Sequence, residues 1–301
     1  MKLSRLCLGT AQLGMIYGIN NEVGKPSFEK SSEIIRIAID NGINAFDTAP
    51  EYGDSELILG KSLESESDDK KKIFFISKYP PTDWSKGLDE IIKGIEPRLR
   101  QSLNNLGITQ MPIYLFHRFI DLEKEDKAIL KELLRLKKHG LIKKIGVSVY
   151  TVEEAEKALE IKGIEAIQLP FNLVDKRALE TGFLKKAKQK KTLLLARSVF
   201  LQGLFFKQTI PQQLSDFEPY QKKILQICRE ENISVGELAL RYALSIDEID
   251  SVLVGVEKKE QLLENIMMMK NGKLKASTIS RINSLGSAPE HIINPSLWGK
   301  K

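Results

Sequence analysis

A chain of 301 residues is long enough for one large domain with a single core or for two ordinary domains. Hydrophobic residues at 42% and charged residues at 29% are ordinary for a soluble globular protein, so the order of the elements must decide the architecture. The net charge of +6 comes from short basic runs such as residues 70–72 and 185–191. These runs lack the interleaved aromatic residues that stack on bases, which disfavours nucleic acid as a partner.

The two cysteines, Cys7 and Cys228, offer neither a disulfide framework nor the spacing of metal ligands, and they fit a reducing compartment. Residues 1–14 contain no sustained apolar stretch, and nowhere do about 18 apolar residues run together. We therefore expect a cytoplasmic protein without a membrane segment or a metal site. The sequence gives no indication of the oligomeric state.

Eight short runs are apolar on both faces, as expected of parallel strands that are covered on either side. In chain order they are residues 5–10, 44–49, 73–78, 113–118, 144–149, 166–171, 192–198 and 251–256. Amphipathic segments lie between them. Residues 27–42 repeat apolar side chains at helical spacing and end at Gly42, and residues 127–140 end in basic residues followed by Gly140.

Strict alternation of strands and helices predicts an α/β fold, a (β/α)8 TIM barrel, with an open doubly wound sheet as the competing architecture. No linker or low-complexity segment divides the chain, so residues 1–301 are interpreted as one domain. Residues 199–220 form a long connection after the seventh strand that is a candidate flap. Residues 284–301 look like an irregular tail near the barrel mouth.

Polar side chains follow three neighbouring strands of this predicted barrel. Asp47, Lys78 and His117 end the second, third and fourth strands, and Tyr52 follows Asp47 by five residues. Neighbouring strands lie about 4.8 Å apart, so we expect the four side chains to converge at the barrel rim. A tyrosine ionises near about pH 10, and a cationic neighbour such as Lys78 lowers that pKa. Taken singly, each residue also fits a helix cap, a solvated charge, a packing residue or a structural histidine.

With these residues in place, the sequence resembles the aldo-keto reductase superfamily of NAD(P)-dependent barrels. The family pattern G-x-x-x-F-D-T-A-x-x-Y-G-x-S-E-x-x-L-G is met by residues 42–60, and the later strands follow it in order. The resemblance implies that Tyr52 is the general acid and base and that Lys78 lowers its pKa. It also implies that Asp47 positions Lys78 and that His117 orients the substrate carbonyl.

The resemblance also implies a nicotinamide cofactor whose carboxamide is held by Ser148 and Gln168, although Val149 replaces a frequent asparagine. Arg197 stands where the family often has a stacking aromatic ring; its guanidinium would stack or reach a phosphate, or it pairs with a neighbouring carboxylate. The remaining positions of the predicted cofactor site are Gly9, Thr10, Ser198, Phe200, Gly203, Gly255, Gln261, Glu264 and Asn265.

The resemblance favours NADPH, with NADH as the alternative. Family members often hold the 2′-phosphate with Ser, Lys or Arg after the eighth strand, and this chain has Glu257 there. A carboxylate repels a phosphate or accepts a ribose hydroxyl, whereas Lys258 and Lys259 still provide positive charge. A solvated charge cluster without a ligand is the third possibility.

The substrate pocket is predicted around Gln12, Tyr17, Trp84 and Trp298, although both tryptophans also fit a packing role. Ala11 replaces an aromatic residue of other branches, which favours an open pocket for a sugar or a small oxo compound. The sequence thus predicts reversible NAD(P)H-dependent reduction of an aldehyde, ketone or sugar carbonyl. A catalytically idle nucleotide-binding barrel that regulates a partner is the alternative, and a metal-dependent hydrolase lacks the ligand clusters it would need.

Overall fold

In the computed structural model, which describes residues 2–21, 23–64 and 72–298, eight parallel strands close into a barrel. Each strand pairs with its neighbours in chain order, and β8 returns to β1. The strands are β1 (Leu6–Gly9), β2 (Ala45–Asp47), β3 (Phe74–Tyr79), β4 (Met111–Phe116), β5 (Ile142–Ser148), β6 (Ala166–Pro170), β7 (Leu193–Arg197) and β8 (Ser251–Gly255). All eight predicted strands are confirmed, as is the single-domain (β/α)8 barrel; an open sheet is excluded because β1 and β8 are paired.

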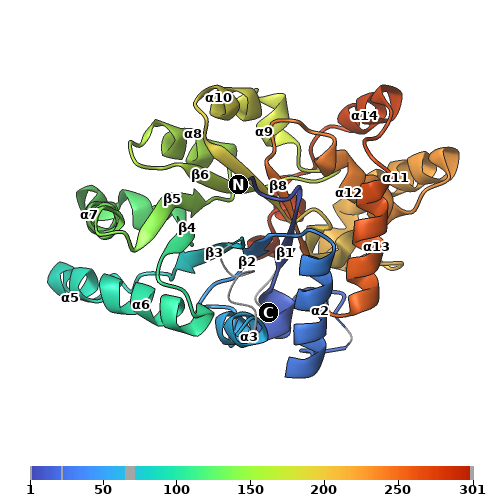
Figure 1. Ribbon diagram of the computed structural model, residues 1–301. Helices are drawn as coiled ribbons and strands as arrows, with labels where there is room; N and C mark the ends of the chain where they lie inside the picture. The colour runs from blue at the N-terminus through green and yellow to red at the C-terminus, as the bar shows by residue number, and fades with distance from the viewer. Residues whose placement is uncertain (1, 22, 65–71, 299–301) are drawn as a thin grey trace.

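Helices surround the strands (Figure 1). They are α1 (Ala11–Gly14), α2 (Phe28–Asp40), α3 (Ser55–Ser62), α5 (Leu88–Lys93), α6 (Ile95–Leu106), α7 (Phe119–Lys138), α8 (Val152–Glu160), α9 (Arg177–Glu180), α10 (Phe183–Gln189), α11 (Glu218–Glu231), α12 (Val235–Leu244), α13 (Lys259–Lys270), α14 (Ala276–Asn283) and α15 (Glu290–Ile293). Within the described ranges, no helix combines the length and apolar character that crossing a membrane requires.

Helix α2 illustrates how the sequence sets an element of the outer layer. The Ser27 hydroxyl accepts a hydrogen bond from the Lys30 N–H at 3.4 Å and caps the first turn. The helix buries an apolar stripe that includes Ile34 and Ile35. It ends as predicted, because Gly42 adopts a φ of +80° that few other residues tolerate.

The barrel interior is filled rather than hollow. Side chains from the strands pack there with almost no exposure, which is the usual construction of this fold. They are Cys7, Ala45, Ile76, Ile113, Leu115, Ala166, Leu195 and Leu253. Cys7 is therefore a small, fully buried core residue. A packed interior leaves the strand ends and the loops beyond them as the place for a ligand.

Two irregular segments pack at the carboxyl end of the barrel. Residues 199–220, the candidate flap, contain the 3-10 helices η1 (Leu201–Phe206) and η2 (Gln212–Phe217), which bury apolar side chains. In the described part of the tail, α15 contacts η2 and is followed by η3 (Pro295–Leu297). The Ala288 N–H donates to the carbonyl of Val174, just beyond β6, at 2.8 Å.

Candidate active site

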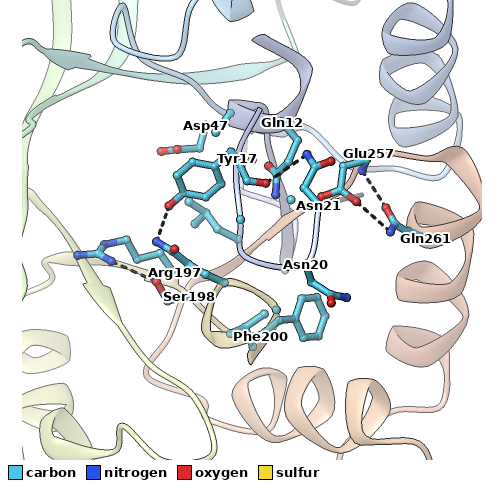
Figure 2. A pocket seen from close by; sticks show the side chains of 18 of the residues that line it. Gln12, Tyr17, Asn20, Asn21, Asp47, Arg197, Ser198, Phe200, Glu257 and Gln261 are labelled. Carbon is cyan, nitrogen blue, oxygen red and sulfur yellow. Dashed lines mark hydrogen bonds between the residues drawn. The ribbon is translucent and has the colours of Figure 1, made fainter. Parts of the chain in front are cut away.

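A cavity of about 200 Å³ lies at the carboxyl ends of the strands (Figure 2). Twelve of the residues predicted from sequence line it: Gly9, Gln12, Tyr17, Asp47, Tyr52, Gln168, Arg197, Ser198, Phe200, Gly203, Gly255 and Gln261. The other lining residues come from the same loops and strand ends: Ala11, Gly18, Asn20, Asn21, Val199, Gln202, Phe206, Leu253 and Glu257. The structure therefore gathers the ends of β1, β2, β6, β7 and β8 around one space.

Asp47 and Lys78 form a buried ion pair beneath this cavity. The Lys78 ammonium lies 2.8 Å from Asp47 Oδ1 and donates to the Thr48 carbonyl at 3.0 Å. Only 1% of Lys78 and 4% of Asp47 is exposed. Burial lowers the pKa of Lys78, but Asp47 and Tyr52 together outweigh burial, so that the pKa ends above its ordinary value. Lys78 is therefore a permanent cation at neutral pH.

Tyr52 lies against this ion pair, in the turn that leads from β2 to α3. The Lys78 ammonium is 4.7 Å from the centroid of the Tyr52 ring. The His117 ring meets the Tyr52 ring edge to face, with centroids 5.8 Å apart and planes at 88°. The predicted convergence of the four side chains is thus observed in the structure.

Two glycines fix the backbone around Tyr52. A Cβ atom on Gly14 would lie 1.8 Å from the Tyr52 carbonyl oxygen, and one on Gly53 would lie 2.4 Å from the Gly14 carbonyl oxygen. Gly53 also adopts a φ of +61°. Helix α1 and the Tyr52 turn are therefore in direct backbone contact, which no other residue at position 14 would permit.

The pKa of Tyr52 differs from the sequence-based expectation. Burial raises the pKa of the phenol, and the Lys78 ammonium opposes this rise without cancelling it, so the pKa lies above its ordinary value. The expectation of a net lowering considered only the cation; it left out the cost of placing a phenolate in a buried site. Tyr52 consequently keeps its proton at neutral pH.

His117 follows the last residue of β4 and is a neutral imidazole. Burial, followed by the charge of Lys78, lowers the pKa of His117 to about 3. Its Nδ1 atom is buried and has no hydrogen-bond partner among the described residues. His117 is not among the residues that line the cavity, but the ring is only partly buried and lies against Tyr52. A neutral ring in this place is suited to hydrogen bonding rather than to carrying charge.

The two predicted carboxamide ligands are linked to the ion pair. The Ser148 hydroxyl donates to Gln168 Oε1 at 3.2 Å, and Gln168 Nε2 donates to Asp47 Oδ2 at 2.7 Å. Gln168 lines the cavity, whereas Ser148 lies behind it. Ser148 is the last residue of β5, and Gln168 is the middle residue of β6.

Arg197, at the end of β7, stacks on an aromatic ring instead of pairing with an acid. Its guanidinium carbon lies 4.4 Å from the centroid of the Tyr150 ring. It donates to the Val149 carbonyl at 2.9 Å and to the Ser198 hydroxyl at 3.1 Å, the latter bond being drawn in Figure 2. No carboxylate in the described ranges pairs with it. The carboxylate-pairing alternative is therefore not what the structure contains.

At the opposite side of the cavity, Glu257 and Gln261 face each other just before and within α13 (Figure 2). Gln261 Oε1 accepts from the Glu257 N–H at 2.8 Å, and its amide donates to the Glu257 carboxylate at 3.2 Å. Lys258 is exposed and does not line the cavity, and Lys259 pairs with Glu33 of α2 at 2.7 Å. The charge presented to the cavity at this end is therefore negative.

Five other predicted residues are held outside the cavity. Thr10 is buried and donates to the Asp47 carbonyl at 2.9 Å, while Asn265 is buried and Glu264 exposed on α13. Both tryptophans use their indole N–H groups for packing contacts: Trp84 donates to Asp121 at 2.8 Å, and Trp298 donates to the Ile292 carbonyl at 3.0 Å. Their assignment to the substrate pocket stays a prediction.

One loop contact of the cavity was not foreseen. The Tyr17 hydroxyl accepts a hydrogen bond from Gln202 Nε2 at 3.0 Å, and the Ile19 N–H donates to the Gln202 carbonyl at 3.2 Å. These bonds join the loop after α1 to η1 and bring Asn20 into the lining. The signal in the sequence is slight: Gly18 and Gly203, whose φ angles are +95° and +96°, mark the two turns.

Comparison with known proteins agrees with this geometry. A model of the Aldo/keto reductase family matches residues 5–287, and the chain therefore belongs to this family of NAD(P)H-dependent carbonyl reductases. Aldo-keto reductase YhdN of Bacillus subtilis is 27% identical over 292 residues, covering 87% of this chain and 84% of that protein.

Two further relatives extend the comparison. The NADH-specific methylglyoxal reductase of Escherichia coli is 25% identical over 301 residues, covering 88% of this chain and 89% of that protein. A solved aldo-keto reductase of Bacillus halodurans, in its holo form, is 21% identical with a TM-score of 0.76. That match covers 98% of this chain and 95% of the solved chain, and it establishes the shared fold.

Proposed function

We propose that the chain reduces a small aldehyde, ketone or sugar carbonyl reversibly with a nicotinamide cofactor, and that Tyr52 provides the proton. The observation that carries this proposal is the contact of Tyr52 with both Lys78 and His117 at the edge of the cavity. An acid, a cation and a neutral hydrogen-bonding group within reach of one substrate oxygen are what carbonyl reduction requires.

The residues of the cavity fit a nicotinamide dinucleotide. Gln168 presents a buried amide at one end of the cavity, and the lining at the other end reaches the start of α13. Ser148 and Gln168 would hold the carboxamide. The absence of a side chain at Gly255 lets Gln12 lie against β8, where both residues line the cavity. The bound cofactor would supply the hydride.

Proton transfer is the part of the reaction that this chain performs itself. The raised pKa of Tyr52 keeps its hydroxyl protonated and ready to donate to the carbonyl oxygen. When the proton leaves, the phenolate forms beside Lys78, whose charge is kept in place by Asp47. His117, neutral because its pKa is about 3, would donate a hydrogen bond to the same oxygen and orient it.

We propose NADH as the cofactor, although the family resemblance alone favours NADPH. Glu257 lines the cavity and is oriented by Gln261, whereas neither Lys258 nor Lys259 reaches it. A carboxylate accepts hydrogen bonds from ribose hydroxyls and repels a 2′-phosphate. The relative named as NADH-specific is consistent with this choice.

The substrate is proposed to be small and polar. Ala11, Gln12 and Tyr17 line the cavity, and its other lining residues carry many amide and hydroxyl groups. One relative is named for methylglyoxal, a small oxo compound. Sugars in their open form and short oxo compounds share the small, hydrogen-bonding character that such a lining favours.

The test is the loss of reduced-cofactor absorbance with NADH and NADPH separately, over a panel of aldehydes, sugars and keto acids. Turnover is expected to be faster with NADH, and Tyr52→Phe is expected to lower kcat by about a hundredfold to ten-thousandfold while cofactor binding persists. Tyr220→Phe, which alters a hydroxyl outside the cavity, is the matched control. Cofactor binding without turnover on any substrate would instead support a regulatory barrel.

A further inference from the structure

A continuous chain of hydrogen bonds crosses the barrel mouth from Ser148 to Lys78. It runs from Ser148 to Gln168, on to Asp47 and then to Lys78, with distances of 3.2, 2.7 and 2.8 Å. We propose that Gln168 is a positioning residue, which couples the bound nicotinamide carboxamide to the Lys78–Tyr52 pair through Asp47. The inference rests on the proposed function.

The capacity of the Gln168 side chain makes this coupling possible. A glutamine amide has two N–H donors and an oxygen with two lone pairs. Gln168 gives one N–H to Asp47 and one lone pair to Ser148, so one donor and one acceptor site remain. The side chain is 1% exposed, yet it lines the cavity. It can therefore bind a carboxamide without releasing Asp47.

The bond between Gln168 and Asp47 spans the barrel rather than joining neighbours. β2 and β6 are four strands apart in a closed barrel of eight, which is the greatest separation that its order allows. The two residues are 121 positions apart in the sequence. Gln168 on the far wall therefore fixes the Asp47 carboxylate, which in turn fixes Lys78.

The two oxygens of Asp47 divide their work. Oδ1 accepts from Lys78 and Oδ2 accepts from Gln168, so the carboxylate is fixed in rotation by two partners. Without Gln168, Asp47 loses one hydrogen-bond donor in a buried site, and its carboxylate interacts more strongly with the Lys78 ammonium. A more fully neutralised ammonium stabilises the Tyr52 phenolate less. The loss of Gln168 would thus make Tyr52 harder to ionise.

Linkage makes the coupling reciprocal. If Gln168 transmits the presence of the carboxamide to Asp47, a change at Asp47 must alter cofactor affinity through Gln168 by the same factor. A residue that only contacts the cofactor shows no such dependence, because effects of independent sites multiply. This difference separates the proposed role from a simple binding contact.

The experiment is a double-mutant cycle on cofactor binding with Gln168→Leu, Asp47→Asn and the double variant. The dissociation constant of NADH is measured by quenching of protein fluorescence, with NADPH run in parallel and the tighter cofactor used. We expect Asp47→Asn to change the constant by about three- to tenfold when Gln168 is present, and by less than about twofold in the Gln168→Leu background. The proposal would be overturned if the change in dissociation constant in the double variant equalled the product of the changes in the two single variants, within about twofold.

The control cycle pairs Asp47→Asn with Gln261→Ala, at the other end of the cavity, where the effects are expected to multiply. Circular dichroism checks folding. If Asp47→Asn does not fold, the pH profile of kcat for alcohol oxidation decides: its apparent pKa should rise by about half to one pH unit in Gln168→Leu and stay unchanged in Gln261→Ala. An unchanged profile in Gln168→Leu contradicts the inference.

The outcomes separate the coupling from the proposed reaction. The binding cycle needs no substrate, so a protein that fails to turn over any carbonyl still reveals whether Gln168 and Asp47 are coupled. If the protein turns over a carbonyl but the effects of the two substitutions on the dissociation constant multiply, the proposed reaction stands and the proposed coupling is wrong. Failure of the unmutated protein to bind NADH or NADPH would overturn both.

Discussion

The two ends of the cavity are built in different ways. At the β2 to β4 end, Lys78 and Asp47 are almost fully buried and every charge has a partner at close range. At the β7 and β8 end, Arg197 and Glu257 are partly exposed and are held by Tyr150 and Gln261 respectively. The first end matches the family pattern at each acid-base position, and the second end departs from it.

The contrast follows from burial. A buried charge is tolerated only with its partner, so removing either member of a buried pair is costly and the set is retained or lost together. A charge at a half-exposed rim is partly solvated, and its replacement by another polar group changes which ligand is preferred more than whether the protein folds. We therefore propose that the first end carries the reaction chemistry and that the second end sets the choice of ligand.

The largest effect is expected from Lys78→Met, which breaks the buried end. Asp47 would be left as a buried carboxylate without its cation, and we expect a loss of about 3 to 5 kcal/mol in the free energy of unfolding. The value of kcat should fall by about a hundredfold to ten-thousandfold. Urea unfolding and steady-state kinetics measure the two effects.

The control for that substitution is the double variant Lys78→Met with Asp47→Asn, in which no charge is stranded. Stability should return largely to that of the unmutated protein while kcat stays low. If the single variant is as stable as the unmutated protein, the buried pair does not hold the first end together.

Glu257→Ser sharpens the comparison at the exposed end. Removing the carboxylate should raise the ratio of kcat/KM with NADPH to that with NADH by about tenfold to a hundredfold, because the repulsion of a 2′-phosphate is relieved. Stability should change by less than about 0.5 kcal/mol. Glu260→Ser, which changes an exposed acid in the first turn of α13 that does not line the cavity, is the control and should leave the ratio unaltered.

His117 provides a test of burial through the pH dependence of stability. Its folded pKa of about 3 lies below the ordinary value of about 6.5, so the unfolded chain binds a proton that the folded protein refuses. The stability contributed is complete above about pH 6.5 and is lost progressively as the pH falls toward 3. When the pH is lowered from 7 to 5, the free energy of unfolding should fall in both proteins. The fall should be about 1 to 2 kcal/mol smaller in His117→Gln than in the unmutated protein.

Denaturant unfolding at the two pH values measures this difference, and His139→Gln is the comparison because that imidazole is exposed. An equal loss of stability in all three proteins would mean that His117 is protonated in the folded protein. Water would then reach the β2 to β4 end of the cavity.

The smallest effects are expected at the two tryptophans. Trp84→Phe and Trp298→Phe each remove one indole hydrogen bond, which should cost about 1 kcal/mol of stability. KM for the substrate should change by less than about twofold, because neither side chain lines the cavity. A larger rise in KM would return these residues to the substrate pocket that the sequence had suggested.

The sequence predicted the barrel and the convergence of four side chains because both depend on local order. Apolar runs mark the strands, and Asp47, Lys78 and His117 occur at fixed places relative to strand ends, which all meet at one rim. Because neighbouring strands are paired in a fixed register, the position of one of these residues at the rim also determines the positions of the other two. This is why the first end of the cavity could be inferred residue by residue.

Features that depend on distant partners could not be inferred in that way. The bond between Gln168 and Asp47 joins opposite walls of the barrel, and the contact of Trp84 with Asp121 joins the loop after β3 to the first turn of α7. The pKa of Tyr52 depends on how completely the fold excludes water, which exceeds the effect of the neighbouring cation. No spacing in the sequence encodes these quantities.

Gly14 and Gly53 have a consequence for redesign of this protein. The Tyr52 turn is held by main-chain contact with α1, which does not involve the side chains of the loops around the cavity. We expect that the loops around Tyr17 and Gln202 can be exchanged for others while the Tyr52 main chain stays in place. Mutant libraries that aim at new substrates should therefore vary these loops and keep Gly14 and Gly53 unchanged.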